Sequence, residues 1–169
     1  MRIRPAEPGD EAAIRAVHAA AFPNPAEADL VEAIVRDGEA VVSLVAAQEG
    51  EVIAHLLLSR MKVEGEGRAY RAVALGPVAV LPGFQGAGIG GTLIESALGV
   101  ARTLGEYLVF VLGEPAFYGR FGFTADAAAP FKSVYSGPYL MALALQPGLP
   151  LPKSGTAAYA RAFSDLPAD

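Results

Sequence analysis

The residues best placed to do chemistry are the glycines between positions 86 and 91, where four glycines fall within six residues. They follow the apolar run Val78–Val80 and precede a segment with apolar residues at helical spacing, Leu93–Leu104. At the first turn of a helix the backbone N–H groups lack partners and the helix dipole favours negative charge, while glycine lets a ligand approach the backbone closely. This order of strand, glycine loop and helix predicts a site for a diphosphate or a similar anion. The alternative is a loop that is merely flexible.

Two familiar phosphate motifs fit this segment poorly. A nucleotide P-loop requires Lys and then Ser or Thr after its last glycine, whereas Thr92 directly follows Gly91. A dinucleotide fingerprint, G-x-G-x-x-G, is matched by Gly86, Gly88 and Gly91, but in that motif the first glycine follows the strand almost immediately. Here Leu81 to Gln85 intervene, so a nicotinamide-binding oxidoreductase is the weaker alternative.

Composition narrows the class of protein. The 169 residues are 53% hydrophobic and 18% charged, which predicts a packed globule rather than a disordered chain. The formal charge of −5 argues against a nucleic-acid partner. The sequence contains no cysteine and only two histidines, so we expect neither a cysteine nucleophile nor a metal site.

The remaining global features predict a location in the cytoplasm. The N-terminal ten residues are charged and contain proline, unlike a signal peptide, and no apolar run approaches the length of a membrane span. We therefore expect no membrane partner.

Apolar periodicity predicts the elements that position the glycine loop. Helical spacing covers residues 10–22 and 24–38, with Asn24 expected to cap the second helix. A third helix is expected to end at Gly105, and a short one covers residues 116–121. Strand patterns occupy residues 2–4, 41–47, 52–63, 70–80, 107–112 and 139–145, with a further strand near Phe123. Gly76-Pro77 interrupts the 70–80 strand, where we expect a bulge or splay.

Several of these segments resemble the GNAT N-acetyltransferase superfamily. Its acetyl-CoA signature is Arg or Gln, two residues, Gly, one residue, then Gly or Ala, and Gln85–Gly90 matches it. Ile3–Ala6 is similar to the first strand of the family, and Gly76–Val80 to its splayed fourth strand. Leu112–Phe123 resembles the Y-x-R-x-G-F segment of a bacterial branch of predicted small acetyltransferases.

The resemblance implies an α/β (α+β) GNAT fold with a mixed central sheet. This sheet would have about six to seven strands, the fourth and fifth splayed, and about four flanking helices. Residues 1–146 would form the acetyltransferase domain, and residues 147–169 a Pro-rich C-terminal extension packed on it or trailing from it. The chain would be a monomer or a homodimer.

The resemblance also implies the activity and the cofactor site. The chain would move an acetyl group from acetyl-CoA to a primary amine of a small-molecule or peptide acceptor by direct attack in a ternary complex. Pantetheine would pair with the strand end, and the pyrophosphate would lie in the glycine loop. The residues implied are Val78, Ala79, Val80, Gln85, Gly86, Ala87, Gly88, Ile89, Gly90 and Gly91. A catalytically silent acyl-CoA-binding sensor is the alternative function.

Two residues are candidates for proton transfer. Tyr118 matches the tyrosine that lies beside the coenzyme sulfur in many family members, which makes it the candidate general acid; packing among neighbouring phenylalanines is its alternative role. Glu114 is a candidate general base, or a charge at the start of a helix.

The other polar residues carry weaker expectations. We expect His55 to be a core or strand residue and His18 to be solvated, while Arg120 would contact a phosphate or cap a helix. Acceptor specificity would come from residues in the first two helices and the late loops: Phe22, Pro23, Glu27, Asp29, Tyr135 and Tyr139.

Overall fold

The structure is a computed structural model that describes residues 1–148 and 150–166. Its strands are β1 (Arg2–Pro5), β2 (Ala40–Gln48), β3 (Glu51–Gly65), β4 (Arg68–Val80), β5 (Leu108–Leu112), β6 (Phe131–Lys132), β7 (Leu140–Ala144) and β8 (Gly155–Ala158). Its α-helices are α1 (Glu11–Ala21), α2 (Ala26–Arg36), α3 (Ile89–Thr103), α4 (Pro115–Tyr118) and α5 (Ala125–Ala128). Short 3-10 helices are η1 (Pro8–Asp10), η2 (Pro82–Phe84), η3 (Gly119–Phe121) and η4 (Arg161–Asp165).

This order confirms the predicted mixed α/β architecture. The strands pair in the order β1-β2-β3-β4-β5-β7, with β8 pairing with β3 and β6. The pairing of β4 with β5 is parallel and joins Ala72–Ala74 to Leu108–Phe110, whereas β5 and β7 are antiparallel. The described residues contain eight strands rather than six or seven, because β6 and β8 were not predicted. In place of a strand near Phe123, Thr124 forms an isolated bridge with Ala142.

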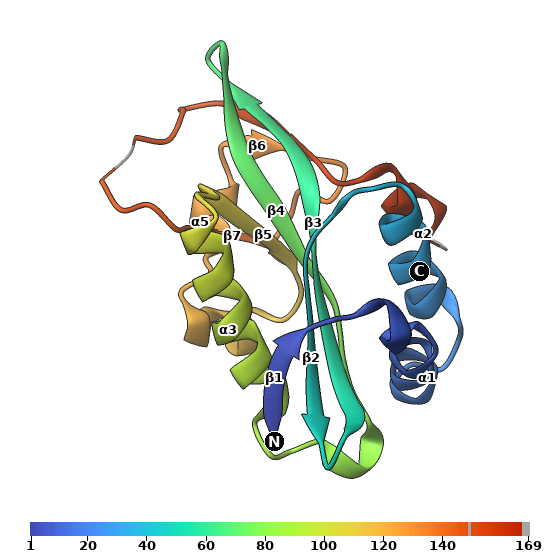
Figure 1. Ribbon diagram of the computed structural model, residues 1–169. Helices are drawn as coiled ribbons and strands as arrows, with labels where there is room; N and C mark the ends of the chain where they lie inside the picture. The colour runs from blue at the N-terminus through green and yellow to red at the C-terminus, as the bar shows by residue number, and fades with distance from the viewer. Residues whose placement is uncertain (149, 167–169) are drawn as a thin grey trace. The chain divides into compact units, whose positions relative to one another are not determined.

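The chain forms two compact units, and the first comprises Met1–Leu58, Gly76–Ala97 and Arg161–Asp169. Its core forms where α1 and α2 pack their apolar faces onto strand residues that include Val45, Leu57 and Ala79. The two helices lie side by side in Figure 1, and η4, coloured red, lies beside α2. The C-terminal segment thus contributes Ala162 to this core. The N-cap of α2 is Pro25 rather than the expected Asn24, whose side chain instead accepts a hydrogen bond from the amide of Ala26 at 2.9 Å.

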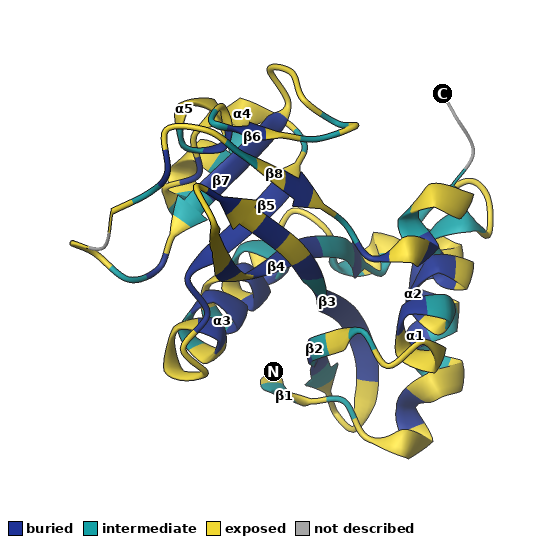
Figure 2. Cartoon of the chain, turned by 90° about the horizontal axis from the view of Figure 1, so that it is seen from above, coloured by how far each residue is buried: buried dark blue, intermediate teal, exposed yellow. Residues whose placement is uncertain are grey.

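The second unit comprises Ser59–Leu75 and Leu98–Ala160. Figure 2 shows buried residues along β5 and β7, as expected for strands whose side chains are covered on both faces. Its core is built on aromatic edge-to-face contacts, with Phe131 at 5.6 Å from Phe110 and 6.4 Å from Tyr70 between ring centroids. β8, which comes from the Pro-rich tail, pairs with β3 and β6 and so completes this unit.

Candidate functional site

The end of β4 carries the first group of predicted cofactor-binding residues, Val78–Val80. The peptide bond Gly76–Pro77 is cis, and Gly76 has φ +135°, so the backbone is irregular where the sequence predicts a bulge. Ala79 is buried in the core of the first unit, whereas Val78 and Val80 are half-buried. Since side chains alternate along a strand, Ala79 anchors the strand while its two neighbours face the other way.

The glycine loop is held to the end of β4 by the side chain of Gln85. Its Nε2 donates a hydrogen bond to the carbonyl oxygen of Val80 at 2.9 Å, a contact that sequence reasoning did not predict. Gly86 and Gly88 follow with φ of +83° and +81°. Only glycine adopts this left-handed conformation without strain, so both positions fix the path of the loop.

The backbone amides of this loop form the second group of predicted cofactor-binding residues. Thr92 is the first residue of α3 whose amide finds a main-chain acceptor, the carbonyl of Gly88 at 3.0 Å, and its hydroxyl donates to the same oxygen. Among the described residues, the six amides from Gly86 to Gly91 have no hydrogen-bond partner. They lie at the start of a 15-residue helix, whose dipole adds positive potential at that end. The arrangement can bind a phosphate or diphosphate.

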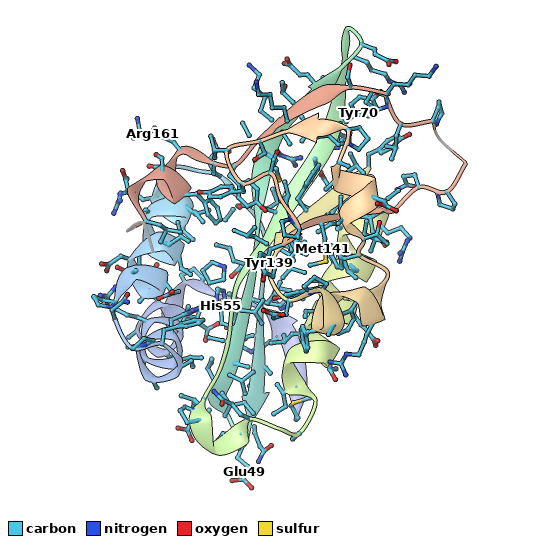
Figure 3. The ribbon with its side chains drawn as sticks, turned by 180° about the vertical axis from the view of Figure 1, so that it is seen from behind. Glu49, His55, Tyr70, Tyr139, Met141 and Arg161 are labelled. Carbon is cyan, nitrogen blue, oxygen red and sulfur yellow. The ribbon has the colours of Figure 1, made fainter. Side chains whose placement is uncertain are left out.

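In the second unit, the turn after β5 positions Tyr118. The amide of Gly113 donates to the carbonyl of Tyr139 at 3.0 Å, and the carbonyl of Glu114 accepts from the amide of Tyr118, also at 3.0 Å. Figure 3 labels Tyr139 in the segment before β7. A Cβ at Gly113 would collide with the Tyr118 ring. Glycine at position 113 therefore makes room for that ring.

The Tyr118 ring combines a packed body with a free hydroxyl. Its centroid lies 4.9 Å from that of Phe117 and 6.0 Å from that of Phe123, both edge-to-face. Its hydroxyl has no hydrogen-bond partner among the described residues. Burial raises the pKa of Tyr118 above its usual value, so the phenol keeps its proton at neutral pH. Such a group can donate a proton but does not act as a resting-state base.

The charged residues beside Tyr118 are more exposed. Glu114 precedes α4, and its side chain makes no capping hydrogen bond. The Arg120 guanidinium lies 4.7 Å from the Phe117 ring centroid, and its Nε donates to the carbonyl of Phe117 at 3.4 Å. Of the two expected roles of Arg120, this contact agrees with the capping of the short helix.

The predicted site residues are thus grouped in two places. Val78–Val80 and Gln85–Gly91 belong to the first unit, and Glu114 and Tyr118 belong to the second.

Residues 2–125 match the family model of the acetyltransferase (GNAT) domain. The chain belongs to the GNAT family.

Curated relatives agree with this assignment. The GNAT chain is 38% identical over 132 residues to the uncharacterized N-acetyltransferase YjhQ of Escherichia coli K12, covering 77% of this chain and 71% of YjhQ. It is 36% identical over 138 residues to the uncharacterized N-acetyltransferase YhbS of the same strain, covering 81% of each.

Two solved structures are similar over nearly the whole chain. The crystal structure of Escherichia coli YhbS in complex with CoA matches with a TM-score of 0.86 and 28% identity, covering 98% of this chain and 93% of that one. A GNAT acetyltransferase of Brucella melitensis in complex with acetyl-CoA matches with a TM-score of 0.77 and 35% identity, covering 96% and 97%. The predicted family and fold are therefore confirmed.

The histidines of this GNAT protein are both buried. His55 is a core residue, as expected, but the prediction that His18 is solvated is wrong, because its exposure is 0%. His18 lies one helical turn after Ile14, on the buried face of α1, and its Nε2 lies 2.9 Å from Nδ1 of His55. The sequence gives no local signal for this pair, since its members are 37 residues apart.

Glu27 of the GNAT protein is more buried at its carboxylate than the sequence indicates. Its Oε2 is buried and has no hydrogen-bond partner among the described residues, whereas Asp29 is exposed and pairs with Arg15 at 2.9 Å.

In the described part of the chain, no cluster of three or more His, Asp or Glu side chains could hold a metal ion. No helix there is long and apolar enough to span a bilayer.

Proposed function

We propose that this GNAT protein transfers the acetyl group of acetyl-CoA to a primary amine of a small-molecule or peptide acceptor, by direct attack in a ternary complex. The observation that carries the proposal is the row of six unpartnered amides from Gly86 to Gly91 at the start of α3. Relatives with 28% and 35% identity hold CoA and acetyl-CoA in their crystal structures. The amides would bind the diphosphate of that molecule.

The main chain would bind the coenzyme at two places, the diphosphate and the pantetheine arm. Gly86 and Gly88 allow the backbone to turn with a positive φ. No atom of the protein lies within 4 Å of the position that a Cβ would take at either residue, so this space is open to the phosphate oxygens. Gln85 would act through its bond to Val80, by fixing the loop against β4. Val78, Ala79 and Val80 would pair with pantetheine as an added strand pairs with an edge.

In the transfer step, the acceptor nitrogen bonds to the thioester carbonyl carbon, and the carbon–sulfur bond then breaks. The amine must first lose a proton, since a lysine-like amine has a pKa of about 10.4 and an α-amino group one of about 8. The amide of Val78 is our candidate donor for the developing oxyanion. Tyr118 would give its proton to the departing thiolate, while the nitrogen, once bonded to carbon, loses its second proton, and that proton restores the Tyr118 phenol through solvent. No protein nucleophile is needed.

Glu114 is the candidate base in this scheme, reached directly or through water. We expect Glu114→Gln to lower kcat by roughly a hundredfold, as for the loss of a general base, while the melting temperature stays unchanged because the side chain makes no capping bond. Steady-state kinetics checks this. An unchanged kcat would leave Glu114 only the role of preceding α4.

The function itself is tested by incubating the protein with acetyl-CoA and a panel of amines while free thiol is measured. The panel should include a polyamine, an amino acid amide, an aminoglycoside and an N-terminal peptide. Thiol release that depends on one of these amines supports the proposal. Coenzyme binding without release on any amine would contradict it and favour a silent sensor.

The diphosphate site is tested by Gly88→Ala. Alanine disfavours φ of +81° by about 1–2 kcal/mol, so the free loop of the variant would leave its binding conformation. Binding of the coenzyme would then have to supply that energy, and we expect the Kd for CoA to rise roughly tenfold. Calorimetric titration with CoA measures this. The matched control is Gly83→Ala, since Gly83 lies in the same segment, with neither a positive φ nor an atom within 4 Å of the added Cβ. Equal Kd values for the two variants would contradict the proposed site.

A further inference from the structure

One carboxylate of the first unit lies in an apolar stripe. Glu27 belongs to the first turn of α2, and the residues three, four and seven positions after it lie on the same face of that helix. These residues are Leu30, Val31 and Ile34, and all three are buried. Figure 2 shows the buried and the exposed side of α2. A charged residue thus occupies a position where an apolar one is expected.

The fold gives this carboxylate no partner. Its Oε2 is buried and accepts no hydrogen bond from the described residues, and none of their cations pairs with it. The other two acidic residues of α2, Asp29 and Glu32, are exposed and pair with Arg15 at 2.9 and 2.8 Å. Partial burial of a charge without a counter-charge costs free energy, and proteins accept such a cost mainly at functional sites.

A ligand can reach the second oxygen of the same group. Glu27 as a whole is half-buried, and of its two carboxylate oxygens only Oε2 is buried without a partner, so Oε1 is the exposed atom. Both oxygens of a carboxylate are acceptors and share its negative charge. A cation at Oε1 therefore also offsets the burial of Oε2.

The face of α2 that carries Glu27 packs on the strand that would bind pantetheine. The apolar residues of this face form one core cluster with Ala79 of β4. In the proposed function, the pantetheine arm pairs with Val78–Val80 and ends in the thioester. A group bound at Glu27 is thus held by the same packed unit as that strand.

The charge of the reacting nitrogen decides which amine Glu27 can hold. The nitrogen that attacks the thioester must be neutral, because an ammonium has no lone pair. A nitrogen that pairs strongly with a carboxylate must be charged. The two roles therefore require two nitrogen atoms in the acceptor.

We propose that the acceptor is a diamine or polyamine, and that Oε1 of Glu27 binds its distal ammonium while the proximal nitrogen reacts. The proposal rests on the proposed acetyl transfer and names its acceptor class. The distal nitrogen keeps its three hydrogens throughout the reaction. Glu27 is therefore a residue that determines specificity, and it is not a base.

The first test compares three acceptors of matched shape by steady-state thiol release. These are 1,5-diaminopentane, hexylamine, in which a methyl group replaces one amino group, and 6-aminohexanoate, in which a carboxylate replaces it, each with its shorter and longer homologues. At the best chain length we expect kcat/KM to be roughly tenfold higher for the diamine than for the monoamine, and lowest for the amino acid. Equal values, or turnover only of amines with one nitrogen, would overturn the proposal while acetyl transfer itself stands.

The second test removes the charge. Glu27→Gln keeps the shape of the side chain, so KM for the diamine should rise roughly tenfold, while kcat and the KM for the monoamine stay unchanged. Glu32→Gln is the matched control, because it makes the same change on the same helix at an exposed carboxylate already paired with Arg15. An equal fall of kcat with both amines would make Glu27 a base and overturn the proposal.

Two further measurements do not need turnover. In calorimetric titration of the CoA-saturated chain, the Kd for the diamine should be roughly tenfold lower for the wild type than for Glu27→Gln. Equal Kd values, or no saturable binding to the wild type, would overturn the proposal. Glu27→Leu completes the apolar stripe of α2, so the melting temperature should rise. A lower melting temperature would mean that the fold itself uses the carboxylate, and would also overturn it.

Discussion

Tyr118→Phe is expected to lower kcat by roughly a hundred- to ten-thousandfold, the range for loss of a positioned general acid, with little change in the Kd for CoA. The substitution removes only the hydroxyl, so the edge-to-face contacts of the ring with Phe117 and Phe123 are kept. Burial raises the pKa of the phenol, and a thiolate has a pKa of about 8.5. Because the phenol is the weaker acid, it does not protonate the sulfur before negative charge develops there, and the effect belongs to the transition state.

Steady-state thiol release and calorimetric titration with CoA measure these two quantities. A melting temperature equal to that of the wild type would show that packing is intact. If kcat is unchanged on an identified acceptor, Tyr118 is a packing residue and another group protonates the thiolate.

The position of the ring is tested without removing the hydroxyl. Gly113→Ala places a methyl group against the Tyr118 ring and must displace it, so kcat should fall as it does in Tyr118→Phe. Gly119→Ala is the matched control, because Gly119 lies in the same segment and its added Cβ meets nothing within 4 Å. Equal activity of the two glycine variants would contradict a requirement for this ring position.

The glycine loop was predictable because its information is local. Gly86 and Gly88 adopt a left-handed backbone that few other residues tolerate, and α3 begins directly after them. A strand, a loop and a helix start can therefore be placed from residue types alone. The side chain of Gln85 was not predictable in the same way, because its bond to Val80 depends on how η2 turns the chain back.

Long-range contacts explain what the sequence did not reveal. β8 became a strand because Lys62–Glu64 offer it an edge almost a hundred residues earlier in the chain, although its own sequence is rich in small residues. His18 is polar and lies late in its helix, which suggested solvation. Its burial follows from a partner on β3, and an isolated helix pattern cannot show that. Prediction from one segment thus failed wherever a second segment supplies the partner.

The same buried pair makes the stability of the fold depend on pH. Burial lowers the pKa of His18 to about 4 and that of His55 to about 3, against 6.5 for a free histidine, and the proximity of His18 lowers the latter further. The unfolded chain therefore binds protons below pH 6.5 that the folded chain does not. The stabilisation is fully present above about pH 6.5 and is lost as pH falls toward 4. Each histidine contributes about 1.4 kcal/mol per pH unit in that window, so the pair should lower the free energy of unfolding by several kcal/mol.

Urea unfolding at intervals between pH 7.5 and pH 4.5 measures the fall in the free energy of unfolding. In this range the histidines, and not the carboxylates with lowered pKa, account for the change. Hydrogen bonds from Arg4 and from the amide of Glu7 lower the pKa of Asp10 to about 2, so its contribution disappears only at more acidic pH. Because the chain contains no other histidine, the double variant His18→Gln/His55→Gln should flatten the pH dependence, and either single variant should reduce its slope by about half. A wild-type free energy of unfolding that stays constant from pH 7.5 to pH 5 would mean that the two rings are hydrated or already charged in the folded chain, and the neutral hydrogen-bonded pair would then be excluded.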